Sequence, residues 1–145
     1  MSRKVSVHHF VANMTTSQSG AHPTSNLLGV DYWYDVPPDA EFPRTIAWMD
    51  LFTRFYLLKA KPVEFYIRVL WQDAPERSRR KIARFGPYMV GFKPDKTVHD
   101  HVFKIFNIRL QGVGRHTIQL LRRRYGSWER PRLTKLIETH FFVEQ

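Results

Sequence analysis

The sequence predicts an all-β fold, a two-sheet antiparallel β-sandwich of roughly eight strands that forms a single domain over residues 1–145. Apolar and polar residues alternate with period two in several runs, and Gly or Pro residues separate most of these runs. Successive side chains of a strand point to opposite faces, so period-two alternation is typical of a strand with one buried face. Only one run also shows a helical period, and many short strands separated by turns favour a sandwich.

The clearest strand is predicted over Val63–Trp71, which follows Pro62. One face of this strand is entirely apolar, whereas the other is mixed, as expected when one face packs on a core. The apolar face comprises Val63, Phe65, Ile67, Val69 and Trp71.

Further strands are expected over residues 4–13, 27–34, 82–92, 98–110, 115–124 and 133–143. Gly86-Pro87 interrupts the run 82–92 and predicts a bend or bulge there. The last two runs flank a loop at 125–131 and are predicted to form a terminal hairpin. Residues 14–26 are rich in Ser, Thr and Gly and are expected to form a flexible surface loop.

Residues 45–58 fit two interpretations. Ile46, Met49, Phe52 and Tyr56 are spaced as a helical stripe, while the segment around Phe55 alternates as in a strand. We expect a strand because β-forming sequences surround the segment.

Composition excludes several classes of protein. The chain carries 23 Lys and Arg against 13 Asp and Glu, a formal charge of +10, and has no cysteine. Disulfides, thiolate metal sites and Cys nucleophiles are therefore excluded. No apolar run approaches about 18 residues, and the N-terminus lacks a secretory pattern, so we expect a soluble cytoplasmic protein. A pI near 10.2 favours anionic partners such as nucleic acid or acidic proteins.

Short motifs in the chain resemble a family. Leu27-Leu28-Gly29 is similar to an early LLGG motif, and a late pattern is loosely matched at 107–110, 112–116 and 120–121. The sequence thus resembles small bacterial single-domain β-sandwich proteins described only as domains of unknown function. Val113 stands where Pro is common in these proteins, and His116 where an aromatic residue is common. The resemblance implies the fold and no activity.

The most distinctive local feature is a pair of arginine-rich segments, one at residues 77–81 and the other at residues 122–132. If their two tips lie at the same end of the sandwich, about ten positive charges converge beside two aromatic rings. Arginines that contact phosphates, together with aromatics that stack on bases, are typical of single-stranded nucleic-acid binding. The alternative is that these cations keep strand edges soluble. The predicted polyanion-binding residues are Arg77, Arg79, Arg80, Lys81, Arg122, Arg123, Arg124, Tyr125, Trp128, Arg130 and Arg132.

A histidine cluster suggests a different hypothesis. His99 and His101 are predicted to point to one face of a strand, and His116 on the next strand is placed to meet them. This pattern is typical of a cupin-like metal-dependent enzyme. However, residues 102–110 contain no Asp or Glu to complete the ligand set, so solvent-facing histidines are the alternative. No cofactor is expected.

Other catalytic patterns are absent from the sequence. Five acidic residues cluster around a Pro-rich loop, which favours a solvated acidic face over an acid/base pair of catalytic carboxylates; they are Asp31, Asp35, Asp39, Glu41 and Asp50. The sequence contains neither a phosphate-binding Gly loop nor a G-x-S-x-G motif. Trp33, Trp48 and Trp71 are expected in the core, although Trp33 beside Tyr32 and Tyr34 would suit a carbohydrate surface. The sequence therefore favours a non-enzymatic binding or structural module whose ligand and oligomeric state stay open.

Overall fold

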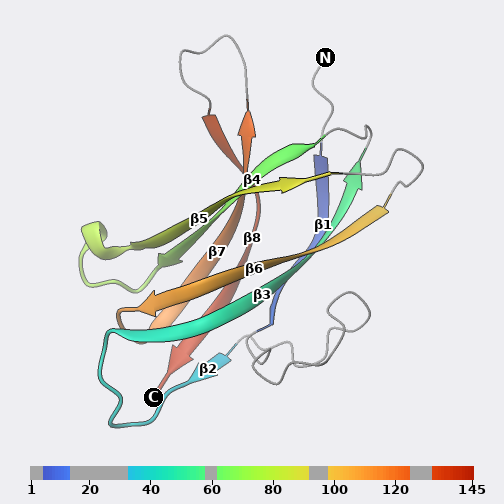
Figure 1. Cartoon of the computed structure of the whole chain (residues 1–145). Coiled ribbons are helices and arrows are strands. Elements are labelled where there is room, and N and C mark those ends of the chain that lie inside the picture. Colours follow the sequence, from blue (N-terminus) through green and yellow to red (C-terminus); the bar gives the residue numbers. More distant parts are fainter. Residues whose placement is uncertain (1–4, 14–32, 58–61, 92–97, 125–131) are drawn as a thin grey trace.

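The computed structural model describes residues 5–13, 33–57, 62–91, 98–124 and 132–145 (Figure 1). These residues form strands and one single-turn 3-10 helix, η2, which spans Arg77–Arg79, so the prediction of an all-β fold is confirmed. In the described residues, no helix is long and apolar enough to cross a membrane. The strands are β1 (Val5–Asn13), β2 (Trp33–Asp35), β3 (Arg44–Leu57), β4 (Val63–Trp71), β5 (Lys81–Val90), β6 (Val98–Leu110), β7 (Gly114–Arg124) and β8 (Arg132–Glu144).

The strands form two sheets. The smaller sheet has the order β1-β3-β6, and the larger has the order β2-β8-β7-β4-β5. In Figure 1, β3 and β6 cross over β7 and β8. The short strand β2 pairs with β8 in parallel, so the larger sheet is mixed and the prediction of a wholly antiparallel arrangement is wrong. A period-two pattern cannot reveal strand direction, because parallel and antiparallel strands alternate in the same way.

Of residues 45–58, for which helix and strand both remained open, the described part, 45–57, belongs to a strand. β3 pairs with β1 on one side and with β6 on the other over most of its length. A central strand with two partners satisfies its backbone hydrogen bonds within the sheet, and this outweighs the helical spacing of its apolar residues. The expected loop at 14–26 and residues 27–32 of another expected strand lie outside the described residues.

β4 is the strand that the sequence predicted best. Its buried and half-buried residues alternate strictly from Val63 to Trp71. On one side it pairs with β7, and on the other with β5, where the register shifts opposite Gly86-Pro87 as the predicted bulge requires. Gly86 has a φ of +122°, a conformation that L side chains rarely adopt.

One hydrophobic core lies between the two sheets. Of its fully buried aromatic residues, Phe55 and Phe103 come from the smaller sheet, and Phe65 and Phe141 come from the larger. The ring centroids of Phe55 and Phe65 are 5.1 Å apart, and those of Phe65 and Phe103 are 5.9 Å apart. We call Phe55, Phe65 and Phe103 the aromatic joint, because these rings connect the sheets directly.

The turn between β6 and β7 packs against the C-terminal end of β4, which lies away from Phe65 and the aromatic joint. Trp71 Nε1 donates a hydrogen bond to the Val113 carbonyl (2.9 Å), and Asp73 Oδ2 accepts one from the Arg115 backbone N–H (2.7 Å). Gly112 packs directly against the Trp71 ring. Gly114 adopts a φ of +111°, which brings the chain against Asp73 and into β7.

Candidate functional site

The two arginine-rich segments lie at opposite ends of the larger sheet. β4 and β7 are antiparallel neighbours, with Trp71 opposite His116 and Phe65 opposite Arg122. The segment that follows β4 therefore lies at one end of this pair, and the end of β7 lies at the other, about 20 Å away along the strands. Figure 1 shows η2 and the end of β7 well apart. The condition for one converging patch is therefore not met, because a segment that follows β4 and the end of its antiparallel neighbour β7 lie at opposite ends of the pair.

The first segment is an exposed surface. Arg77, Arg79, Arg80 and Lys81 are all exposed, and Arg79 lies 3.9 Å from the Glu76 carboxylate in a solvated ion pair. The Arg80 carbonyl accepts a hydrogen bond from the Trp71 backbone N–H (2.6 Å), which fixes the backbone but not the guanidinium groups. Solvated cations of this kind can keep the protein soluble as well as they can bind an anion, so their exposure does not distinguish the two roles.

At the other end, three arginines share one face. Leu120 pairs with Ile137 on the core face, and the register then shifts by one residue between Leu120 and Leu121. Side chains directly opposite each other across a pair of strands point to the same face. Beyond the shift, Arg122 pairs with Thr134 and Arg124 pairs with Arg132, all on the face that Phe65 shares. We call Arg122, Arg124 and Arg132 the arginine cluster.

Arg123 points to the other face of the sheet. Its Nη1 lies 2.9 Å from Glu64 Oε2, and the same carboxylate accepts a hydrogen bond from the Tyr66 hydroxyl (3.0 Å). Arg123 is thus matched to an acid, and it is separated by the sheet from the arginine cluster. The three consecutive arginines at 122–124 therefore do not act as one basic run.

Like charges are held close together within the arginine cluster. Partial burial, and then the positive charge of Arg124, lower the pKa of Arg122 below its usual range. Arg124 Nε is buried and makes no hydrogen bond within the described part of the chain. Both effects favour a bound anion, because phosphate or carboxylate oxygens accept hydrogen bonds from guanidinium groups and offset their repulsion. The predicted contacts Tyr125, Trp128 and Arg130 lie outside the described residues.

Acidic residues gather at the opposite end of the sheet. Asp35 pairs with Glu144 at the end of β8, near the start of β7, and Asp39 and Glu41 follow β2. All four residues are exposed. These acids lie at the end of the sheet where the first arginine-rich segment also lies, and the arginine cluster lies far from these carboxylates.

The three predicted metal ligands do not converge. His99 and His101 do share a face of β6, with ring centroids 6.3 Å apart, and His101 packs edge-on against Phe103. His116 instead lies near the far end of β4, where Trp71 pairs with it. Within the described ranges, no three His, Asp or Glu side chains are placed to hold a metal ion. The proposed histidine cluster is thus wrong: β6 and β7 are not paired and belong to different sheets.

His116 is a core residue. It is fully buried, and its ring lies between those of Trp71 and Phe141, with centroid distances of 6.3 and 4.9 Å. Its Nδ1 lies 3.0 Å from the Gly114 carbonyl, so Nδ1 carries the proton and donates it. Its Nε2 is buried and has no hydrogen-bond partner among the described residues. Burial lowers the pKa of His116 from 6.5, although the Gly114 hydrogen bond and Asp73 oppose this shift.

We expect His116 to make the fold sensitive to mild acid. Its pKa is lower in the folded chain than in the unfolded chain, so between these two values the unfolded chain binds more protons. The free energy of unfolding should therefore fall as pH decreases below about 6.5, by at most about 1.4 kcal/mol per pH unit. Urea unfolding at pH 5.0 to 7.5 should show a shallower decline for His116→Phe, which keeps a flat ring in the stack. An equal stability difference between variant and wild type at all pH values would contradict this role.

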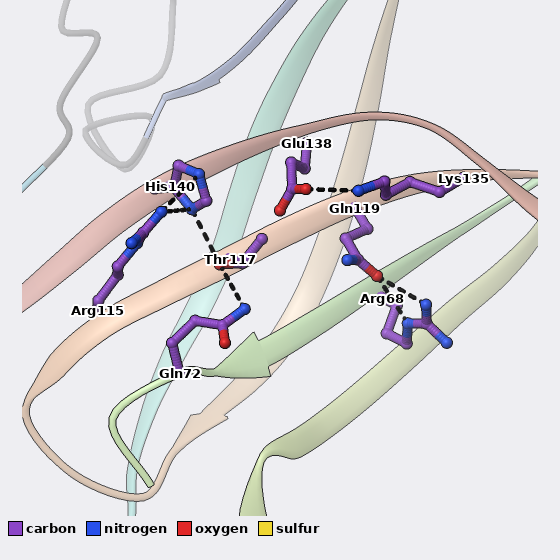
Figure 2. A network of polar contacts seen from close by, with 8 residues as sticks. All are labelled: Arg68, Gln72, Arg115, Thr117, Gln119, Lys135, Glu138 and His140. Carbon is purple, nitrogen blue, oxygen red and sulfur yellow. Dashed lines mark hydrogen bonds and ion pairs between the residues drawn. The ribbon is translucent and has the colours of Figure 1, made fainter.

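A polar network covers the outer face of the larger sheet, and the sequence did not reveal it (Figure 2). Arg68 Nε and Nη2 both donate to Gln119 Oε1, at 2.9 and 2.8 Å. Gln72 Nε2 donates to Thr117 Oγ1 (3.0 Å), which lies 2.9 Å from His140 Nδ1. The network connects Arg68 of β4, and Gln72 just after β4, to alternate positions of β7 and to His140 of β8. Only the register of these strands shows that the positions meet.

Arg115 and two further residues complete this face. Arg115 Nη2 lies 3.1 Å from His140 Nε2, and Lys135 Nζ lies 2.6 Å from Glu138 Oε1 (Figure 2). Desolvation, followed by the charge of Arg115, lowers the pKa of His140, so the neutral ring accepts from Arg115. The network is internally matched and explains why the buried polar groups Thr117 and Gln119 are tolerated in a central strand.

Comparison with solved structures finds similar chains. The chain is similar to a Pseudomonas fluorescens alkylpurine DNA glycosylase AlkC bound to DNA containing an abasic site analog, with 10% sequence identity and a TM-score of 0.48. The match covers 97% of this chain and 30% of that one. No family model and no curated protein matches the sequence.

Proposed function

We propose that the chain is a non-enzymatic module that binds polyanions, and single-stranded nucleic acid in particular. The contact that we assign to the phosphates is the arginine cluster at the end of the β7–β8 pair. The observation that carries the proposal is the register, which places Arg122, Arg124 and Arg132 on one face with two of them directly opposite. Three neighbouring guanidinium groups repel one another, and a polyanion supplies the charge that offsets this repulsion.

We also infer that the two sheets form one domain of sandwich type. Support comes from the core, because residues of both sheets belong to one buried cluster. The aromatic joint lies at the level of Arg122, since Phe65 and Arg122 are neighbours across β4 and β7. A rigid joint at this level would hold the arginine cluster at a fixed spacing, as a binding surface requires.

The test compares two pairs of substitutions that remove the same charge. We expect Arg122→Gln/Arg124→Gln to weaken binding of a labelled 12-nucleotide oligo-dT by about 25-fold at 0.1 M salt, the value of two lost phosphate contacts. Arg77→Gln/Arg79→Gln, at the opposite end of the sheet, should change the affinity by less than threefold. Fluorescence anisotropy measures both affinities, and urea unfolding verifies that each variant is folded.

Three results would contradict the proposal. Wild-type protein that does not bind oligo-dT at 0.1 M salt would remove its basis. Equal losses in the two variants would show that net charge, and not the arginine cluster, attracts the oligonucleotide. An unchanged affinity in Arg122→Gln/Arg124→Gln would show that the cluster makes no phosphate contact.

A further inference from the structure

In the smaller sheet, the alternation of buried and outward-facing residues is interrupted at one place on both β3 and β6. On β3 the buried positions are Ile46 and then Met49, and on β6 they are Ile105 and then Ile108. On both strands the buried residues therefore switch from even to odd positions, or from odd to even, at the same place. This place lies between the pairs Ile46–Ile108 and Trp48–Phe106. Asn107, with a φ of +56°, lies at this point, and Asn tolerates such a conformation better than most residues. A local irregularity of this kind re-aims neighbouring side chains.

The consequence is an aromatic pair on the outer face. Trp48 and Phe106 are directly opposite each other, and Phe106 is 54% exposed. Trp48 is half-buried, so the expectation that it lies in the core is wrong; Trp71, in contrast, is buried as expected. Among the described residues, the other large apolar side chains that are exposed are not aromatic.

Cations flank this pair along β6. Lys104 and Arg109 are both exposed and lie two positions before and three positions after Phe106. The ammonium group of Lys104 lies 5.8 Å from the centroid of the Trp48 ring. The nearby carboxylate of Asp50 lies 3.8 Å from Lys104 Nζ but is 13% exposed, so the accessible charge beside the rings is positive. At about 3.3 Å per residue, the two cations are separated by roughly 16 Å along the strand.

We propose that Trp48 and Phe106 form a stacking platform for unpaired bases, with Lys104 and Arg109 holding the adjacent phosphates. This inference rests on the proposed binding of single-stranded nucleic acid and adds a second contact on the other sheet. Base faces stack on aromatic side chains with little sequence preference, and neighbouring cations follow the backbone. A duplex keeps its base faces covered, so the platform selects single strands.

The test uses two polyanions, one with bases and one without. Phe106→Ala should weaken binding of a 12-nucleotide oligo-dT about tenfold, the loss expected for one stacked base. Its affinity for inorganic polyphosphate of similar length should stay within twofold of wild type. Met89→Ala is the matched control, because Met89 is 61% exposed and lies on β5 of the other sheet. This control should change neither affinity.

Fluorescence provides a second measurement. Binding of oligo-dT should quench tryptophan emission in the wild type, and Trp48→Phe should lose much of that quenching while retaining most of the affinity. Equal losses for oligo-dT and polyphosphate in Phe106→Ala, or no loss for either, would overturn the platform while leaving polyanion binding intact. Failure of the wild type to bind both polyanions would overturn the proposed function as well.

Discussion

Phe65→Ala is expected to lower the free energy of unfolding by about 3–5 kcal/mol, the cost of deleting a fully buried aromatic ring. Phe65 is completely inaccessible and contacts both other rings of the aromatic joint. The cavity cannot collapse easily, because Phe55 and Phe103 belong to the opposite sheet and are held there by β3–β6 pairing. Urea denaturation of the full chain measures the change.

Phe106→Ala is the control for this prediction. It removes the same side chain from the same kind of element, but the ring of Phe106 is 54% exposed. Its effect on the free energy of unfolding should stay below about 0.5 kcal/mol, as is usual for surface positions. Similar losses in the two variants would show that the sheets are not joined through Phe65.

Gly114→Ala is expected to destabilise the chain by about 2–4 kcal/mol for two separate reasons. A φ of +111° is strained for any residue with a side chain. In addition, the new Cβ would overlap Asp73 Oδ2 and lie 2.9 Å from Asp73 Cβ. Displacing Asp73 would remove the acceptor of the Arg115 backbone N–H, which lies at the start of β7.

A double-mutant cycle separates these two causes. Gly114→Ala should cost less in an Asp73→Ala background, because the overlap with the carboxylate and the lost hydrogen bond are already removed, while the contact with Cβ of residue 73 and the backbone strain remain. Gly91→Ala serves as the control, since a Cβ there meets no atom within 4 Å; it should change stability by less than about 0.5 kcal/mol. An additive cycle would contradict the role assigned to Asp73.

The strands of this fold could be predicted largely from local pattern, and their arrangement could not. Val63–Trp71 alternates strictly because one face packs on the core, and the observed bounds of β4 agree with the prediction. The short β2 and its parallel pairing with β8 depend on contacts between residues more than 100 positions apart, which leave no local signal. Alternation also failed to locate the change of face at Ala47 and Asn107, where sheet geometry overrides the period.

For the candidate site, too, the sequence indicated individual residues but not their arrangement. Arg122 and Arg124 were selected by their charge, and the register added that they share a face with Arg132 and not with Arg123. The supposed convergence with Arg77 depended on strand order, which the sequence did not contain. His116 was selected as a ligand by its residue type and its place on the strand that follows His99 and His101, although the run after it on β7, residues 117–121, is buried as in a core strand.

The salt dependence of oligo-dT binding tests the central claim most directly. The slope of log Kobs against log salt concentration counts phosphate contacts, at about 0.7 per contact for single strands. We predict that Arg122→Gln/Arg124→Gln reduces the magnitude of this slope by about 1.4 relative to wild type, while Arg77→Gln/Arg79→Gln leaves it unchanged. A wild-type slope near zero, or the same reduction in both variants, would contradict binding of polyanions through the arginine cluster.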